Sequence, residues 1–267
     1  MKRASAGWIQ IYRYCLWDLL RSRFVLAYFG FFLLASFGIF RFAPNTSAAF
    51  GSLLSAMLLV SPLCCQVYGT LYFYQSRGFH ELMLAQPIGR GSLGLGQWLA
   101  LASALCSAFF LGVGVPMAVQ GFLGGQDFLL LAVFLGGGLL LHLAFLALAF
   151  WVGISIEDRL KGFSLSLLIW LALVFLYDGI VLVLVAQFSD YPLEKPVLAA
   201  MLLNPVDLER VLILMRLDSS ALLGYTGAVF RKFFGTGLGT AVSMSALTAW
   251  IAGPLSLFYY KLKRKDW

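Results

Sequence analysis

The chain has 267 residues, of which 61% are hydrophobic and only 12% are charged, and its mean hydropathy is +0.89. Because a soluble domain is about 45–50% apolar and about 25% charged, this composition excludes an ordinary soluble protein and predicts an all-α integral membrane protein. The formal net charge of +7 does not indicate a nucleic-acid partner, since basic residues beside membrane spans report orientation instead.

Residues 1–23 predict an amphipathic helix that lies in the cytoplasmic membrane interface, as an elbow before the first span. One face is aromatic and aliphatic, while the other carries most of the polar side chains. The apolar positions follow i, i+3, i+4, i+7 spacing and are Trp8, Ile11, Tyr12, Cys15, Leu16 and Leu19. The alternative is a cytosolic helix packed on a partner protein. No cleaved signal peptide is indicated, because the first apolar run is long enough to span.

Six apolar runs follow, and each is long enough to cross a hydrocarbon core of about 30 Å as a helix. Helices are favoured because lipid offers no hydrogen-bond partner to free backbone N–H and C=O groups. The predicted transmembrane spans are 24–42, 50–74, 93–120, 127–153, 163–188 and 236–260. Together with the segments between them, they are predicted to form one membrane-embedded domain over 1–267.

The distribution of Lys and Arg predicts that both termini are cytoplasmic. With the N-terminus inside, the inner segments and the C-terminal tail hold thirteen basic residues, whereas the short outer loops hold only Arg41. The long segment 189–235 holds the remaining five, and long translocated segments largely escape this rule. The sequence therefore predicts a multi-pass membrane protein with its N-terminus and C-terminus in the cytoplasm.

Segment 75–92, between the second and third spans, is predicted to be cytoplasmic and to contain a short amphipathic helix that ends at Pro87. Such a helix either docks into a groove on another protein or rests on the bilayer, and the pattern alone favours neither. The stretch 89–94 spells G-x-G-x-x-G. No strand precedes it and no acid follows about 20 residues later, so a dinucleotide site is not indicated. We expect these glycines to give a flexible entry into the third span.

The outer segment 189–235 contains a helix-start signal, with Asn204 at the N-cap, Pro205 at the first helical position and Asp207 in the first turn. Polar positions around the apolar stripe that follows are Glu209, Arg210 and Arg216. A second piece, 221–234, mixes aromatic residues with two basic ones. Both are predicted to be short amphipathic helices on the extracytoplasmic face before the last span. Their apolar sides would lie in lipid headgroups, in the helix bundle or against a partner.

Few polar side chains lie inside the predicted spans. Asp178 is costly in lipid and is a functional candidate, but we expect it near the outer face, shielded by a partner helix or water. His142 is expected to be a buried, hydrogen-bonded histidine. Cys64, Cys65 and Cys106 are only weak metal candidates, because adjacent helical residues point about 100° apart and seldom share one ion. No catalytic residue set, resident metal or cofactor is predicted for this chain.

The layout of six spans, an interfacial elbow, a cytoplasmic helix and outer helices resembles that of the ABC-2 type transporter permeases. Sequence detail supports the resemblance. The coupling segment of these permeases, an acid-Leu-x-Leu-x-Gln-Pro core followed by a basic residue, is similar to SRGFHELMLAQPIGR. The branch of the family that serves nitrous oxide reductase maturation has outer segments and a basic tail similar to NPVDLERVLIL, GAVFRKFFG and KLKRKDW. The similarity covers most of the chain.

This resemblance implies a homodimer that carries two cytoplasmic ABC ATPase subunits (NosF-like). Those subunits would hold ATP and Mg, since this chain has no P-loop motif and is not expected to be an enzyme. The resemblance also implies a periplasmic β-helical accessory protein (NosD-like), a copper chaperone, and assembly of the copper–sulfur centre of nitrous oxide reductase. The residues implied to face the ATPase are Arg77, Phe79, Glu81, Leu82 and Met83. Those implied to face the accessory protein are Asn204, Asp207, Glu209, Arg210, Arg216, Arg231 and Lys232.

In the implied mechanism, ATP binding closes the ATPases, the short cytoplasmic helix moves with them, and the second and third spans tilt as levers. The outer helices then pull or release the accessory protein. Two rival functions stay open at this point. One is an ABC-2 exporter of a lipid, drug or peptide. The other, from a different class, is a membrane anchor or redox subunit that binds haem or quinone, although the chain has only two histidines.

Overall fold

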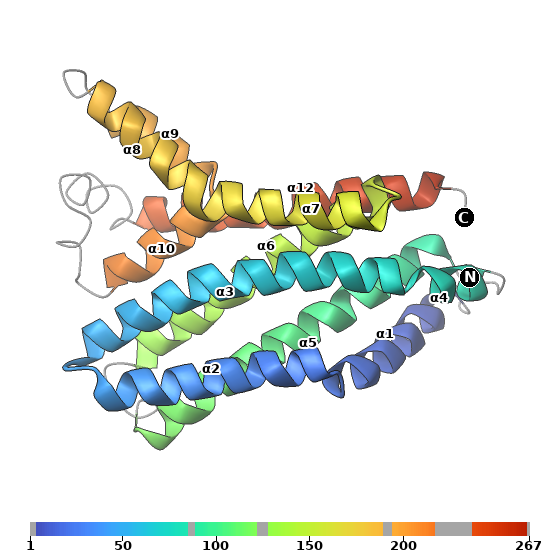
Figure 1. Ribbon diagram of the computed structural model, residues 1–267, viewed down its shortest axis with the longest axis horizontal. Helices are drawn as coiled ribbons and strands as arrows, with labels where there is room; N and C mark the ends of the chain where they lie inside the picture. The colour runs from blue at the N-terminus through green and yellow to red at the C-terminus, as the bar shows by residue number, and fades with distance from the viewer. Residues whose placement is uncertain (1–3, 85–88, 122–127, 189–193, 217–236, 266–267) are drawn as a thin grey trace.

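The computed structural model describes residues 4–84, 89–121, 128–188, 194–216 and 237–265 (Figure 1). Within these ranges the chain is helical apart from short connections and contains no strand, which confirms the predicted all-α class. In chain order the helices are α1 Ala4–Leu20, α2 Arg23–Phe42, α3 Thr46–Gln75, α4 Arg77–Leu84, α5 Arg90–Val119, α6 Phe128–Ser155, α7 Arg159–Leu171, the π-helix η2 Ala172–Leu176, α8 Tyr177–Gln187, α9 Glu194–Leu202, α10 Pro205–Arg216 and α12 Gly237–Arg264.

Among the described residues, six helices are long and apolar enough to cross a membrane, as the sequence predicted. These are Arg23–Phe42, Thr46–Gln75, Arg90–Val119, Phe128–Ser155, Arg159–Gln187 and Ala241–Arg264. The fifth is composed of α7, η2 and α8, and the chain changes direction where α7 passes through η2 into α8 (Figure 1).

Polar side chains begin several of these helices. The Ser22 hydroxyl accepts a hydrogen bond from the backbone N–H of Val25 at 3.2 Å, which starts α2. Asn45 does the same for α3, with its Oδ1 2.8 Å from the N–H of Ala48. Because the first turn of a helix leaves backbone donors without partners, such caps define where each span can start.

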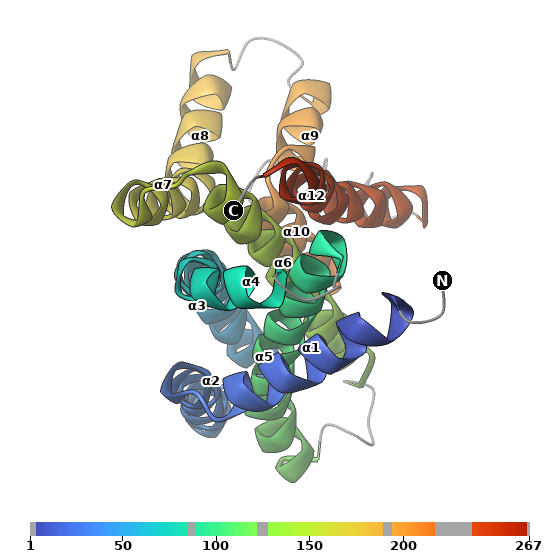
Figure 2. The ribbon, with the colours of Figure 1, turned by 90° about the vertical axis from the view of Figure 1, so that its right-hand side faces the viewer.

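Helix α6 lies in the middle of the bundle and contacts α3, α5, α7, α10 and α12 (Figure 2). Aromatic rings fill the space around it. The ring of Phe73 on α3 lies 5.6 Å from that of Phe150 and 6.0 Å from that of Phe258 on α12, centroid to centroid. Gly153 of α6 makes room, since a Cβ there would come within 2.6 Å of the Phe73 ring. In lipid such close van der Waals packing is what holds helices together.

The glycines of the G-x-G-x-x-G stretch have a packing role that the sequence analysis did not predict. They lie inside or directly before α5, so they do not form a flexible entry. A Cβ on Gly91 would collide with the Tyr259 ring, and one on Gly94 with the Leu262 side chain, both on α12. Glycine is therefore needed here because α12 crosses the start of α5 at close range.

Helix α1 packs one face against α5. Ile11, Cys15 and Leu19 are buried on this face, in agreement with the predicted apolar spacing. The opposite side leaves the aromatic rings of Tyr14 and Trp17 exposed. Exposed aromatic residues of this kind are enriched at membrane interfaces. The interfacial position of α1 stays a prediction, and the exposed surface of α1 agrees with it.

The first and the last described helices, α1 and α12, have their outer ends at the same end of the bundle (Figure 1). Helix α4, the first turns of α1 and the last turns of α12 lie there, whereas α10 and the α2–α3 connection lie at the other end (Figure 1). The Arg90 guanidinium donates hydrogen bonds to the carbonyls of Lys263, at 3.2 Å, and Lys265, at 2.9 Å. A cation that binds the last carbonyls of a helix also stabilises its dipole, so the end of α12 is held against the start of α5.

Candidate functional site

Helix α4 is attached to the bundle by its first residue. The Arg77 guanidinium donates hydrogen bonds to the backbone carbonyls of Ile156, at 3.1 Å, and Glu157, at 2.8 Å, which belong to the α6–α7 connection. It also lies 4.6 Å from the centre of the Tyr74 ring on α3, a cation–π contact. Arg77 thus connects α3, α4 and the end of α6, and its guanidinium is occupied within the chain.

The next turn of α4 is fixed by His80. Its side chain is buried and hydrogen-bonded to the amide oxygen of Gln97 on α5, and its ring lies 5.3 Å from that of Phe73. Burial lowers the pKa of His80 to about 4, the Gln97 hydrogen bond opposes this shift, and the nearby charge of Arg77 adds to it. The imidazole is therefore neutral near pH 7 and acts as an attachment between α4 and α5.

The outward side of α4 is free of such contacts in the part of the chain that the structure describes. Glu81 is exposed, and Leu82 has 70% of its surface accessible. Phe79 stacks on Tyr14 of α1, with ring centroids 5.9 Å apart, and Met83 is half-buried. Of the five residues implied to face an ATPase, the structure thus leaves Glu81 and Leu82 on the surface, whereas the guanidinium of Arg77 is used internally.

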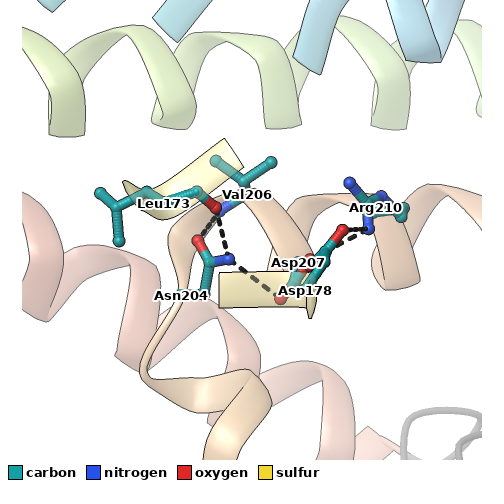
Figure 3. Close-up of polar contacts among 6 residues, drawn as sticks. All are labelled: Leu173, Asp178, Asn204, Val206, Asp207 and Arg210. Carbon is teal, nitrogen blue, oxygen red and sulfur yellow. Dashed lines mark hydrogen bonds and ion pairs between the residues drawn. The ribbon is translucent and has the colours of Figure 1, made fainter. Parts of the chain in front are cut away.

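At the other end of the bundle, a π-helical turn creates a polar cluster (Figure 3). A π-turn interrupts the regular hydrogen-bond ladder, and the side-chain amide of Asn204 donates to the Leu173 carbonyl at 2.9 Å. The same Asn204 caps α10, because its Oδ1 accepts from the N–H of Val206 at 3.0 Å. The predicted helix start at Asn204 and Pro205 is therefore confirmed, and one side chain fixes α10 to the bend in the fifth span.

Asp207 and Arg210 extend this arrangement into what we call the outer polar cluster, namely Asp178, Asn204, Asp207 and Arg210. Arg210 donates to the Asp178 carboxylate at 2.6 Å and to Asp207 at 3.1 Å, and Asp207 also accepts from Asn204 at 2.9 Å (Figure 3). Burial raises the pKa of Asp207 to about 7, with Asp178 adding to the rise and Arg210 opposing it. Asp178 thus lies against a cation from α10, which offsets the cost of an acid within a span.

An open groove of about 1010 Å³ runs beside this cluster, between α3, the η2–α8 region and α10. Its lining is mostly apolar, and the Asp178–Arg210 pair lies at its edge. Small residues of α3 that line it are Ser47, Ala48, Gly51, Ser52 and Ser55. Because both side chains of the ion pair are about one-third exposed, at 31% and 32%, the pair is accessible from the groove.

The structure corrects the predicted surface position of α10. Asn204 and Glu209 are fully buried and Asp207 is 6% exposed, because α10 inserts between α3, α6 and α12. As placed here, these three offer almost no surface to an accessory protein, and Arg210 is the partly exposed member of the predicted set. Arg216 ends α10, while Arg231 and Lys232 lie outside the described residues.

His142 is buried at the centre of the bundle. Its Nδ1 is 2.6 Å from the carbonyl oxygen of Gly138, and its Nε2 is 2.6 Å from the hydroxyl of Tyr28 on α2. Tyr28 is also 2.9 Å from the Ser61 hydroxyl on α3. The imidazole is therefore a hydrogen-bonding group that connects three spans, since α2, α3 and α6 all contribute.

The weak metal candidates Cys64, Cys65 and Cys106 lie on α3 and α5. Among the described residues, no group of three His, Cys, Asp or Glu side chains is placed to hold a metal ion. Cys65 and Cys106 are buried, whereas Cys64 is only partly covered. All four cysteines are free.

The sequence analysis predicted neither the π-turn in the fifth span nor the contact between Glu209 and α6. The π-turn at 172–176 has no signature that periodicity can detect. The carboxylate of Glu209 packs against Gly137 of α6, and the run of three glycines at 136–138 was the available signal. Adjacent glycines in a span indicate a place where another group approaches the backbone, but they do not say which group.

These observations define a polytopic α-helical membrane protein with an exposed short helix between its second and third spans. The family model described as "ABC-2 family transporter protein" matches residues 75–267. The chain therefore belongs to the ABC-2 transporter family. Curated relatives named "Probable ABC transporter permease protein NosY" occur in Pseudomonas aeruginosa and Stutzerimonas stutzeri. Each is 27% identical, over 264 and 266 residues, and the matches cover 93% of this chain and 94% and 95% of the relatives.

Proposed function

We propose that this chain is the membrane subunit of an ABC transporter that couples ATP hydrolysis in a separate cytoplasmic ATPase to work outside the membrane, namely maturation of the copper–sulfur centre of nitrous oxide reductase. Membership of the ABC-2 family supports the coupling role. Similarity to relatives named NosY over nearly the whole length supports the particular process. The chain itself has no P-loop, so the ATPase activity belongs to a partner.

The observation that carries the proposal is that side-chain contacts hold one side of α4 against the bundle and leave the other side exposed. Its exposed residues, Glu81 and Leu82, sit on a short helix whose other side is fixed to three spans by Arg77 and His80. A partner that moves α4 would therefore move α3, α5 and the end of α6 together. Coupling requires that the α4 contact differs between the nucleotide states of the partner.

At the far end, the same spans reach the outer polar cluster. Both α3 and α6 contact α10, and α10 is connected to the bend in the fifth span through Asn204 and Arg210. We propose that motion of α3 and α6 shifts α10, and that α10 with its following segment acts on a periplasmic β-helical partner. In this scheme the chain functions as a homodimer in the inner membrane, with α4 and both chain ends in the cytoplasm.

The α4 contact can be tested with a matched pair of exposed leucines. Leu82 on α4 and Leu160 in the first turn of α7 are 70% and 76% exposed, and α4 and the start of α7 lie at the same end of the bundle (Figure 1). Leu82→Arg should reduce the ATPase that copurifies with the tagged chain by about tenfold or more, as expected for loss of an interface anchor. Leu160→Arg should retain it. Equal retention by both variants would remove α4 as the docking site.

Glu81→Arg tests coupling separately from assembly. We expect it to insert normally into the membrane but to uncouple ATP turnover from nitrous oxide reductase maturation, because it reverses a charge on the exposed side of α4. Unchanged maturation of the reductase in cells that carry only this variant would exclude Glu81 from the mechanism.

An ABC-2 exporter of a lipid, drug or peptide is the second candidate, and the open groove beside the outer polar cluster favours it. An amphipathic molecule could place its apolar part along α3 and an anionic group near Arg210. The neighbouring coding regions separate the two functions. Genes for an ATPase, a periplasmic β-helix protein and a copper chaperone support the first, whereas an ATPase gene alone supports the exporter.

A further inference from the structure

Glu209 is an isolated acid inside the bundle. Its side chain is fully buried, and neither carboxylate oxygen has a hydrogen-bond partner among the residues that the structure describes. The carboxylate lies against Gly137 of α6, so closely that a Cβ at that position would collide with it. A buried carboxylate without partners is costly, and native proteins retain such groups mainly where they bind something or carry a proton.

A cavity of about 430 Å³ adjoins this carboxylate, between α6, α10 and α12. Apart from Glu209 its described lining is apolar, and it includes Val133, Leu140, Leu212, Met215 and Met244. This volume is many times that of one water molecule, which takes up about 30 Å³ in the liquid. It is therefore large enough for a small amphipathic molecule with one polar end at Glu209.

No described acidic or basic side chain on the lining helices faces Glu209. On α6, which is described over its whole length, His142 is the only titratable side chain. Its ring nitrogens are hydrogen-bonded to Gly138 and Tyr28. On α10, Asp207 and Arg210 are directed to Asp178 in the outer polar cluster. The described cations of α12 lie in its last turn, at the opposite end of the bundle. Consistently, burial is the sole cause that raises the pKa of Glu209 to about 8.

We propose that Glu209 and the adjacent cavity bind a lipophilic amine, that is, a protonated amino group on an apolar body that fills the space between α6, α10 and α12. On binding, the carboxyl group releases its proton to solvent, and the resulting carboxylate pairs with the ammonium group. Charge complementarity selects a cation, and the apolar lining selects against a molecule with a second charge close to the first.

The test uses the full-length protein in detergent micelles, with n-octylamine as the probe and n-octanol as the neutral control. Octylamine should bind more tightly than octanol. Its affinity should fall about tenfold for each pH unit below about 8 and level off above it, because the proton and the amine compete. Glu209→Gln should weaken octylamine binding by about tenfold or more and remove the pH dependence, while octanol binding stays unchanged. Partition into the micelle is common to both proteins and cancels in the comparison.

A second measurement does not depend on the folding of a variant. A water-insoluble carbodiimide should couple octylamine to wild-type Glu209 as an amide, with release of the corresponding urea, and peptide mass spectrometry would locate the adduct on α10. Equal affinity for octylamine and octanol would overturn the proposal, and so would an unchanged pH profile in Glu209→Gln. Selective retention of phosphatidylethanolamine without any response to octylamine would overturn it as well, in favour of a lipid headgroup.

Discussion

Gly136 and Gly137 are adjacent on α6, yet an added methyl group meets different surroundings at the two positions. At Gly136 nothing lies within 4 Å of the new Cβ. At Gly137 the new Cβ would overlap the carboxylate of Glu209. The same Gly→Ala substitution therefore meets open space at position 136 and the Glu209 carboxylate at position 137. Comparing the two variants tests whether Glu209 lies where the structure places it.

The magnitudes can be worked out from these surroundings. Replacing a helical Gly by Ala stabilises a helix by about 1 kcal/mol, which is the whole expected effect of Gly136→Ala. In Gly137→Ala the same gain is opposed by about 1–3 kcal/mol, because the Glu209 side chain must leave its place beside α6 and turn toward the adjoining apolar cavity. The two variants should therefore differ by about 2 kcal/mol, which corresponds to very roughly 4–8 °C in Tm for a chain of this size.

Thermal unfolding of the purified full-length variants in the same detergent measures this difference. The double variant Gly137→Ala, Glu209→Ala provides the control, because removal of the carboxylate makes room for the methyl group. In the Glu209→Ala background, Gly137→Ala should become stabilising by about 1 kcal/mol. Equal Tm values for Gly136→Ala and Gly137→Ala, or the absence of coupling in the double variant, would refute the placement of Glu209 beside α6.

Two further predictions concern α10. Asn204→Ala should lower the free energy of unfolding by about 2–3 kcal/mol, because it removes the α10 cap and leaves the Leu173 carbonyl unpaired. Asn204→Ser, which keeps a cap oxygen but not the amide donor, should lie between, and a wild-type Tm in Asn204→Ala would contradict this role. Burial raises the pKa of Glu209 from 4.5 to about 8, so the folded state holds this proton more tightly than the unfolded state. Wild-type stability should thus decline as the pH rises from about 4.5 through 8, and Glu209→Gln should reduce that decline, most clearly above pH 7; parallel pH profiles in equilibrium unfolding would show that the carboxyl titrates normally.

The spans could be predicted closely because their signal is local. A run of about 20 apolar residues must cross the membrane as a helix, whatever its neighbours are, since each backbone group has to find its partner within the same segment. The start of α10 at Asn204 and Pro205 was predictable for a similar reason, because a cap depends on adjacent residues only. The fifth span was predicted as one run, but its π-turn was not, and the residue that binds the Leu173 carbonyl in this turn, Asn204, lies far along the chain.

The candidate sites were predictable to different extents. The short helix after the second span was identified from its charges and Pro87, yet which residues are exposed follows from contacts with other helices. Arg77 was expected on a docking surface, but carbonyls of the α6–α7 connection hold its guanidinium. Glu209 was expected on the extracytoplasmic face, where it would contact an accessory protein. Instead, α10 packs into the bundle and buries Glu209 against Gly137. Amphipathic spacing defines two sides of a helix and does not decide which side faces the bundle.

The sequence by itself determined that this protein is a six-span helical membrane protein with a short helix after its second span and a capped helix before its last. Hydrophobicity, length and capping are properties of contiguous residues, so no knowledge of the fold is needed to interpret them. Only the tertiary structure decided that α10 is an internal helix, that Asp178 pairs with Arg210, and that Glu209 has no hydrogen-bond partner in the described part of the chain. Those outcomes depend on which helices lie beside one another, and close packing between distant segments leaves no periodic trace in the chain.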